Sequence, residues 1–164
     1  MSDPTGLIIT IATERDVPHI LAFIRALAEY ERLADSVVAT EDGLRATLFG
    51  PRPYAECVIA RWNGEPAGFA LFFHNYSTFL ARPGVYLEDL FVKPELRGKG
   101  VGRALLQYLA KVAVDRGCGR LEWSVLDWNE SAIGFYRSLG AEPLEDWTIF
   151  RLKGEALARL AGPN

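Results

Sequence analysis

The chain has 164 residues, of which 49% are hydrophobic and 24% are charged, and its formal net charge is −3. A chain of this size can bury one good core, so we expect a single domain over residues 1–164. The mild acidity disfavours binding to nucleic-acid phosphates, and the longest apolar runs, residues 69–73 among them, are far shorter than the roughly 20 residues that span a bilayer. We therefore expect a cytoplasmic protein with no nucleic-acid partner and no membrane partner.

The first predicted elements are a strand at residues 7–12 and two helices. In the first helix, residues 17–30, apolar side chains recur every three or four positions and give one apolar face. The second helix, residues 40–48, begins at Thr40, which can cap it, and stops before Gly50-Pro51.

Three strands should come after these helices. Residues 55–62 and 67–73 are joined by Asn63-Gly64, a dipeptide that suits the positive φ angles of a tight hairpin. Residues 85–92 form the third strand, and we expect the polar stretch 74–84 before it to be a loop over the functional site.

A glycine-rich turn comes next, between this strand and a long helix that runs to Gly117. Gly98, Gly100 and Gly102 allow backbone N–H groups to converge at the positive end of the helix dipole, which predicts an anion site. The turn is neither of the common nucleotide loops. Arg103 stands where a dinucleotide motif needs its third glycine, and no Gly-Lys-Ser/Thr of a P-loop is present.

The remaining elements are a strand at residues 120–126, a helix at 129–139, a last strand at 147–152 and a short tail helix. This order predicts an α/β (α+β) domain, with helices on both faces of a mixed, mostly antiparallel sheet.

A second motif lies about thirty residues after the glycine-rich turn. Residues 125–136 read Val-Leu-Asp-Trp-Asn-Glu-Ser-Ala-Ile-Gly-Phe-Tyr. Together with the Arg-x-x-Gly-x-Gly pattern of residues 97–102, this motif resembles the GNAT N-acetyltransferases, which implies the GNAT fold and acetyl-coenzyme A as cosubstrate. Taken alone, Asn129 could be only an N-cap and Tyr136 only a core aromatic.

Three further segments, residues 27–31, 86–89 and 125–129, are similar to the diamine (spermidine/spermine) acetyltransferases and their thialysine-acetylating relatives. That resemblance implies a homodimer, with Glu88 as a base acting through a water molecule and Tyr136 as the acid. The residues it implies for the cofactor are Leu90, Phe91 and Val92 at the acetyl and pantetheine end, Arg97, Gly98, Lys99, Gly100, Val101, Gly102 and Arg103 at the pyrophosphate, and Asn129, Glu130, Ser131, Ala132 and Tyr136 along the arm. The acceptor residues it implies are Tyr30, Glu31, Glu88, Glu122, Trp123 and Ser124.

Chemistry supports the two proposed catalytic residues. An alkylammonium has a pKa near 10 and must lose a proton before its nitrogen attacks a thioester, so a base such as Glu88 is useful. The backbone N–H of Val92 is a candidate to polarise the acetyl carbonyl, and a phenol such as Tyr136 can protonate the leaving thiolate. Alternation puts Glu88 on one face of its strand and Asp89 on the other, and a solvated strand carboxylate is the other interpretation of Glu88.

Other reactive side chains give no competing site. Cys57 and Cys118 lie in no activating motif and have no metal-ligand spacing, and His19 and His74 do not form a catalytic pair. We expect direct transfer without a covalent intermediate and without a metal.

The predicted activity is the transfer of an acetyl group from acetyl-coenzyme A to a primary amine of a small molecule: a diamine, a polyamine or a lysine-like amino acid. The segment 76–82 has no carboxylate, which departs from the polyamine enzymes and looks more like the thialysine relatives. Whether Glu145 or Asp146 reaches the amine stays open. The alternatives are a protein-lysine or amino-sugar acetyltransferase, and a non-catalytic coenzyme A module.

Overall fold

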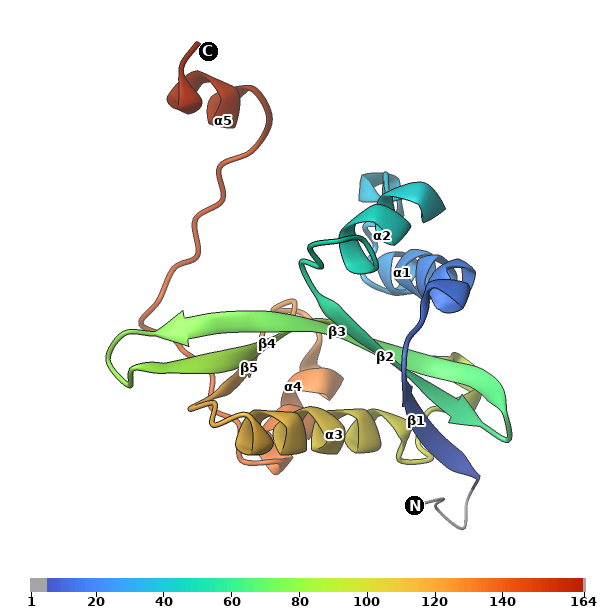
Figure 1. Cartoon of the computed structure of the whole chain (residues 1–164). Helices are drawn as coiled ribbons and strands as arrows, with labels where there is room; N and C mark the ends of the chain where they lie inside the picture. The colour runs from blue at the N-terminus through green and yellow to red at the C-terminus, as the bar shows by residue number, and fades with distance from the viewer. Residues whose placement is uncertain (1–5, 164) are drawn as a thin grey trace. The chain divides into compact units, whose positions relative to one another are not determined.

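The computed structural model describes residues 6–163, and contacts within the chain divide it into two compact units (Figure 1). The first unit reaches Leu126 and the second begins at Asp127. The first contains β1 (Leu7–Ile11), α1 (Val17–Tyr30), α2 (Glu41–Leu48), β2 (Glu56–Trp62), β3 (Glu65–Ser77), β4 (Arg82–Val92), α3 (Val101–Asp115) and β5 (Leu121–Trp123). The second contains α4 (Glu130–Ser138) and α5 (Gly154–Ala161). Short 3-10 turns occupy Glu14–Asp16, Ala34–Ser36 and Pro94–Leu96.

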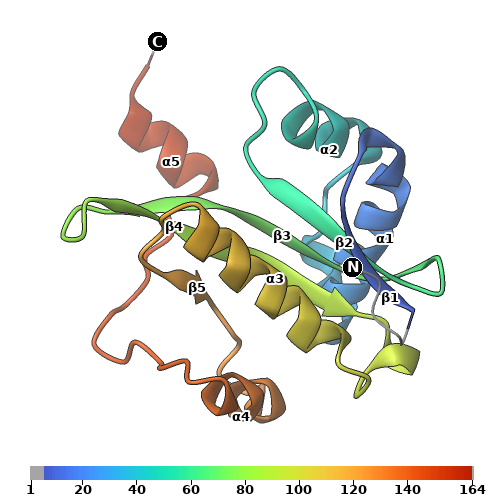
Figure 2. The same cartoon turned by 60° about the horizontal axis from the view of Figure 1, so that its bottom comes forward.

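The five strands form one sheet in the order β1-β2-β3-β4-β5. All neighbours pair antiparallel except β4 and β5, which are parallel. Helices α1 and α2 lie on one face of this sheet and α3 lies on the other (Figures 1 and 2). The predicted mixed, mostly antiparallel sheet with helices on both faces is therefore confirmed.

The core against α1 is built from aromatic rings. Phe23 of α1 stacks on Phe69 of β3 with ring centroids 5.4 Å apart, and it lies 5.9 Å from Phe91 of β4. Ile20 and Ile59 are fully buried beside them. The apolar spacing in residues 17–30 thus correctly identified the buried face of α1, and this packing fixes the end of α1 beside β4.

The prediction of a loop at residues 74–84 is wrong. Strands β3 and β4 continue their antiparallel pairing as far as Ser77 and Arg82, so that only a short turn separates them. Polar side chains in this stretch form hydrogen bonds within the sheet and its turn. Asn75 donates a hydrogen bond to Glu122 of β5, and Ser77 Oγ accepts one from the Leu80 N–H. A polar sequence at a sheet margin was mistaken for a loop.

The predicted strand at residues 147–152 is also wrong, and the strand predicted at 120–126 is shorter, at Leu121–Trp123. Trp147 and Phe150 are 77% and 92% exposed. A strand requires a partner for its N–H and C=O groups, and none of the strands in residues 6–163 pairs with this segment. The tail helix expected after it is α5.

Candidate active site

A β-bulge places two adjacent carboxylates of β4 near the end of α1. The β3 register pairs Phe72 with Leu87 and Leu71 with Asp89, so Glu88 is an extra residue on β4. A bulge bends the strand and redirects the side chains around it. Asp89 faces α1 as Phe91 does, which agrees with the predicted alternation for those two residues.

Three carboxylates share this region, which we call the carboxylate group: Glu31, Glu88 and Asp89. Burial raises the pKa of Asp89 to about 6, and the negative charges of Glu88 and Glu31 add to this effect. Burial and the charge of Glu88 also raise the pKa of Glu31. Because like charges at close range disfavour one another, a bound cation would be stabilised here.

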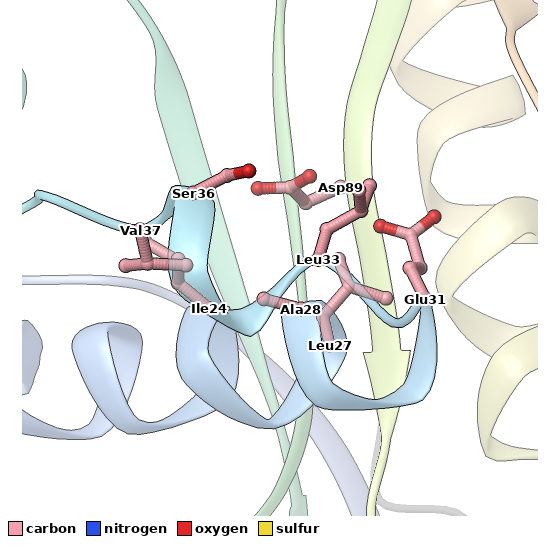
Figure 3. Close-up of a pocket in the computed structure, with 8 residues that line it drawn as sticks. All are labelled: Ile24, Leu27, Ala28, Glu31, Leu33, Ser36, Val37 and Asp89. Carbon is pink, nitrogen blue, oxygen red and sulfur yellow. The ribbon is translucent and has the colours of Figure 1, made fainter.

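A small cavity of about 150 Å³ lies beside two of these carboxylates. Its lining residues come from α1, from the turn after it and from β4: Ile24, Leu27, Ala28, Glu31, Leu33, Ser36, Val37 and Asp89. Figure 3 shows the apolar side chains of α1 on one side of the cavity and the carboxylates of Glu31 and Asp89 on the other. Asp89 and Ser36 are not among the site residues predicted from the sequence, and the Glu-Asp pair at residues 88–89 was the only available signal for Asp89.

The edge of β4 beyond the bulge is open. On that side β4 pairs with β5 only through Val85, Tyr86 and Leu87, and no strand of the described chain continues the pairing along residues 88–92. The Lys93 N–H donates to Ala67 of β3. Because N–H groups of successive residues point to opposite sides of a strand, the N–H of Val92 points away from β3 and toward the open edge. An extended molecule with amide groups could bind along this edge.

The glycine-rich loop, residues 97–102, follows the 3-10 turn after β4 and includes the first two residues of α3. Gly98 and Gly100 have φ angles of +75° and +85°, and a Cβ atom added at either position would meet nothing within 4 Å. Backbone conformation, not lack of space, requires these two glycines. Gly100 is also the N-cap of α3, so the loop stands at the positive end of a 15-residue helix, as the sequence predicted.

The cationic side chains of this loop pack on aromatic rings of the first unit. Arg97 donates from Nε to the carbonyl oxygen of Val92 at 3.0 Å, and its Cζ lies 4.9 Å from the ring centroid of Tyr30. Lys99 Nζ lies 5.6 Å from the ring centroid of Trp62 at the end of β2. Val101 is buried at the start of α3, whereas Arg103 is exposed.

The proposed acceptor residues of β5 lie beside β4. Glu122 accepts a hydrogen bond from Asn75 and lies 3.4 Å from Arg120. Ser124 Oγ and the Tyr86 hydroxyl are 2.7 Å apart. Trp123 pairs with Leu87, the residue before the bulge. These residues thus lie along the part of β4 that leads to Glu88.

The second unit carries the other proposed cofactor residues on one helix. The Asn129 side chain accepts a hydrogen bond from the Ala132 N–H at 3.3 Å and so caps α4. Tyr136 is half-buried on the same helix, 5.8 Å from the Phe135 ring. Glu130 and Ser131 in the first turn are exposed. The capping role that the sequence allowed for Asn129 is confirmed.

Cysteine chemistry is disfavoured by the environment of Cys57. Burial raises the pKa of this thiol to about 12, so it stays protonated at neutral pH.

Within residues 6–163, no three His, Cys, Asp or Glu side chains gather to hold a metal ion. None of the helices described there is long and apolar enough to cross a bilayer.

Residues 10–141 match the model of the acetyltransferase (GNAT) family. A thialysine N-epsilon-acetyltransferase of Bos taurus is 45% identical over 92% of this chain and 95% of its own length. An L-ornithine N5-acetyltransferase of Arabidopsis thaliana is 37% identical over 91% of this chain and 85% of its own. An integron cassette protein from the mobile metagenome of V. cholerae superposes with a TM-score of 0.82 at 26% identity, covering 96% of this chain and 99% of that one.

Proposed function

The chain belongs to the GNAT acetyltransferase family and is an N-acetyltransferase, and on this premise we propose that it transfers the acetyl group of acetyl-coenzyme A to a primary amine of a small molecule. The amine attacks directly, in a ternary complex of enzyme, donor and acceptor. One observation carries the proposal: the open edge of β4 runs from the carboxylate group to the glycine-rich loop, so a cation site and an anion site lie at its two ends.

The residues present fit acetyl-coenzyme A. The loop leaves the space above Gly98 and Gly100 free of side chains, as the close approach of a pyrophosphate requires. Leu90, Phe91 and Val92 offer the acetyl and pantetheine end an open strand edge. In the second unit, the residues proposed to bind the pantetheine arm of coenzyme A are Asn129, Glu130, Ser131, Ala132 and Tyr136. When bound, the thioester supplies the acetyl group.

In the proposed reaction, residues of the chain accept and donate the protons. Glu88 takes a proton from the acceptor ammonium through a water molecule, which leaves the nitrogen free to attack. The Val92 N–H stabilises the negative charge that develops on the acetyl oxygen. Tyr136 gives its phenolic proton to the sulfur as the carbon–sulfur bond breaks, and the second proton that the nitrogen loses when the amide forms restores the phenol. The buried thiol of Cys57 supports transfer without a covalent enzyme intermediate.

The acceptor we favour is a lysine-like amino acid with a primary amine in its side chain. Two relatives are named for thialysine and ornithine, and the carboxylate group suits an ammonium. Tyr30, Glu31 and Glu88 would bind it, together with Glu122, Trp123 and Ser124 of β5 and its end. A diamine or polyamine is the alternative occupant of the same site.

We further propose a homodimer in the cytoplasm. Large apolar side chains of the second unit are exposed, among them Leu144, Trp147, Ile149 and Phe150, and burying side chains of this kind against a second copy would stabilise a dimer. Sedimentation velocity should give twice the monomer mass, and Trp147→Glu should lower the dimer fraction. A monomer at all concentrations would refute this part of the proposal.

The test of the activity is coenzyme A release over a panel of lysine-like amino acids, polyamines, an aminoglycoside and a lysine peptide. We expect the highest turnover with a small primary amine, and no turnover with any small amine would overturn the proposal. Tyr136→Phe should lower kcat by about 10² or more while leaving acetyl-coenzyme A affinity nearly unchanged. Tyr54→Phe, at an exposed tyrosine outside the site, is the matched control. An unchanged rate in Tyr136→Phe would remove Tyr136 as the acid.

A further inference from the structure

Arg97 connects the glycine-rich loop to the end of α1. We propose that its side chain is a positioning residue, which holds Tyr30 and Glu31 in place for the acceptor and thereby couples the acceptor site to the cofactor loop. This inference rests on the proposed function and deepens it. The resemblance assigns Arg97 to the pyrophosphate; here its backbone belongs to the anion loop and its guanidinium serves the acceptor.

Three contacts fix the orientation of the guanidinium. Its Nε donates to the Val92 carbonyl oxygen at 3.0 Å, and its Cζ lies 4.9 Å from the Tyr30 ring and 5.5 Å from the Phe91 ring. A planar guanidinium can stack on a ring while its edge donates a hydrogen bond, which a lysine ammonium cannot reproduce in one geometry. The side chain therefore joins the last residue of β4 to the last residue of α1.

The position of the Tyr30 ring matters because the next residue along the chain is Glu31. Tyr30 is the last residue of α1, and Glu31, the C-cap, lines the cavity with Asp89. The backbone of this helix end is held by hydrogen bonds to the carbonyls of Leu27, Ala28 and Glu29 from the N–H groups of Glu31, Leu33 and Arg32. The cation over the Tyr30 ring adds a side-chain contact to this backbone anchor, directly beside Glu31, whose pKa is raised by burial and by the charge of Glu88.

Lys99 provides a comparison within the same loop. Its ammonium lies over the ring of Trp62, at the end of β2 and away from α1. Both cations tie the loop to an aromatic ring, but only the ring under Arg97 belongs to the proposed acceptor site. Replacing each cation by glutamine removes a similar contact, and the two changes should therefore affect different substrates.

The experiment measures kcat and both KM values for the wild type, Arg97→Gln, Arg97→Lys and Lys99→Gln. The amine is the one with the highest wild-type turnover. An exposed cation–π contact corresponds to a change of roughly 2- to 5-fold. We expect Arg97→Gln to raise the KM for the amine by about this factor with kcat nearly unchanged, and Arg97→Lys to restore part of it. Lys99→Gln should change only the KM for acetyl-coenzyme A.

A double-mutant cycle adds the second measurement. Tyr30→Phe keeps the ring and should keep the effect of Arg97→Gln, whereas in Tyr30→Leu the further loss of Arg97 should change the amine KM by less than about twofold. An amine KM unchanged by Arg97→Gln, or changed equally by Lys99→Gln, would overturn the inference while the proposed function stands. A wild type that turns over no amine would instead overturn the proposed function.

Discussion

The carboxylate group and the glycine-rich loop lie at opposite ends of the same few residues of β4, and they differ in how they are built. At the carboxylate group the side chains provide the charge: Glu31, Glu88 and Asp89 concentrate negative charge in a partly buried place. At the loop, a partial positive charge would come from backbone N–H groups at the start of α3. Gly98 and Gly100 leave these groups accessible, because they have positive φ angles and no side chain. A cation site here depends on which side chains are present, and an anion site depends on which are absent.

The open edge of β4 links these two sites. Within the described part of the chain, residues 88–92 lack a strand neighbour on the side where β5 has ended. A donor molecule lying along this edge would present its acetyl end to the carboxylates and its phosphates to the loop. Substitutions that change a charge in the carboxylate group should therefore affect the acceptor amine. Substitutions that add a Cβ atom in the glycine-rich loop should affect binding of the donor.

The largest expected effect is on the carboxylate side. Glu88→Gln keeps the size of the side chain and removes the proposed base, and should lower kcat by about 10²-fold or more. The acetyl-coenzyme A KM should change little, because Glu88 lies outside the loop. Steady-state rates from pH 6 to 9 test this, since a lost base should lower the rate most on the acidic side, where more of the amine is protonated.

Glu95→Gln is the matched control for this change. Glu95 is an exposed carboxylate in the 3-10 turn after β4, outside the carboxylate group. Its replacement should leave both kcat and the pH profile as in the wild type. Equal rates in Glu88→Gln and the wild type would remove Glu88 as the base.

A smaller effect is expected at the loop. Gly100→Ala puts a side chain on a residue with φ +85°, which costs about 1–2 kcal/mol in an L-residue. The loop should shift to relieve this strain, and calorimetric titration should show coenzyme A binding about tenfold more weakly. The amine KM should change less than the coenzyme A affinity.

Gly102→Ala separates backbone conformation from space. Gly102 has no positive φ, and its added Cβ would lie 3.8 Å from Val92 Cγ2, an ordinary contact. We expect a weaker effect on coenzyme A affinity than in Gly100→Ala. A larger effect at Gly102 would mean that the loop is limited by space above the helix start and not by backbone conformation.

The sequence predicted the fold well wherever periodicity marked a buried face. The apolar spacing from Ile20 to Ala28 identified the face of α1 that packs on the sheet, and Thr40 and Asn129 marked two helix starts, as their side-chain caps confirm. It failed at residues 74–84 and 147–152, where the outcome depends on strand partners distant in the chain. Strand pairing is a non-local property that local composition does not contain.

The sequence predicted candidate site residues, which stay predictions, but it could not predict the geometry of β4 around them. Alternation puts Asp89 on the face opposite Glu88 but does not say which face is buried, and it could not predict the bulge that makes Glu88 an extra residue on β4. The burial of Asp89 was therefore missed. The packing of Arg97 on Tyr30 was missed for a similar reason, since those residues are far apart in the sequence and meet only through the end of α1.

Asp89 allows the electrostatic side of the comparison to be tested without any substrate. Its pKa is about 6 in the folded protein against a usual value of 3.8, so between these values the folded state binds a proton that the unfolded state has lost. The free energy of unfolding contributed by this group is therefore highest below pH 4 and falls as the pH rises toward and through 6. Charge on Asp89 destabilises the fold at neutral pH.

The smallest predicted effect follows from this dependence of the free energy of unfolding on pH. Asp89→Asn should raise the free energy of unfolding at pH 7.5 by about 1 kcal/mol, less than the full pKa shift implies, because the amide that replaces the carboxylate is itself costly to bury. It should also flatten the dependence of that free energy on pH between 4 and 6, as measured by urea denaturation across that range.

Glu56→Gln should act in the opposite direction, because the Arg116 hydrogen bond lowers the pKa of Glu56 and its charged form is the stabilising one. If Asp89→Asn is instead destabilising at pH 7.5 and stays so at pH 4, then the Asp89 carboxylate is held by a favourable partner. The carboxylate group would then be a set of paired charges, and its attraction for a cationic acceptor would have to come from Glu31 and Glu88 alone.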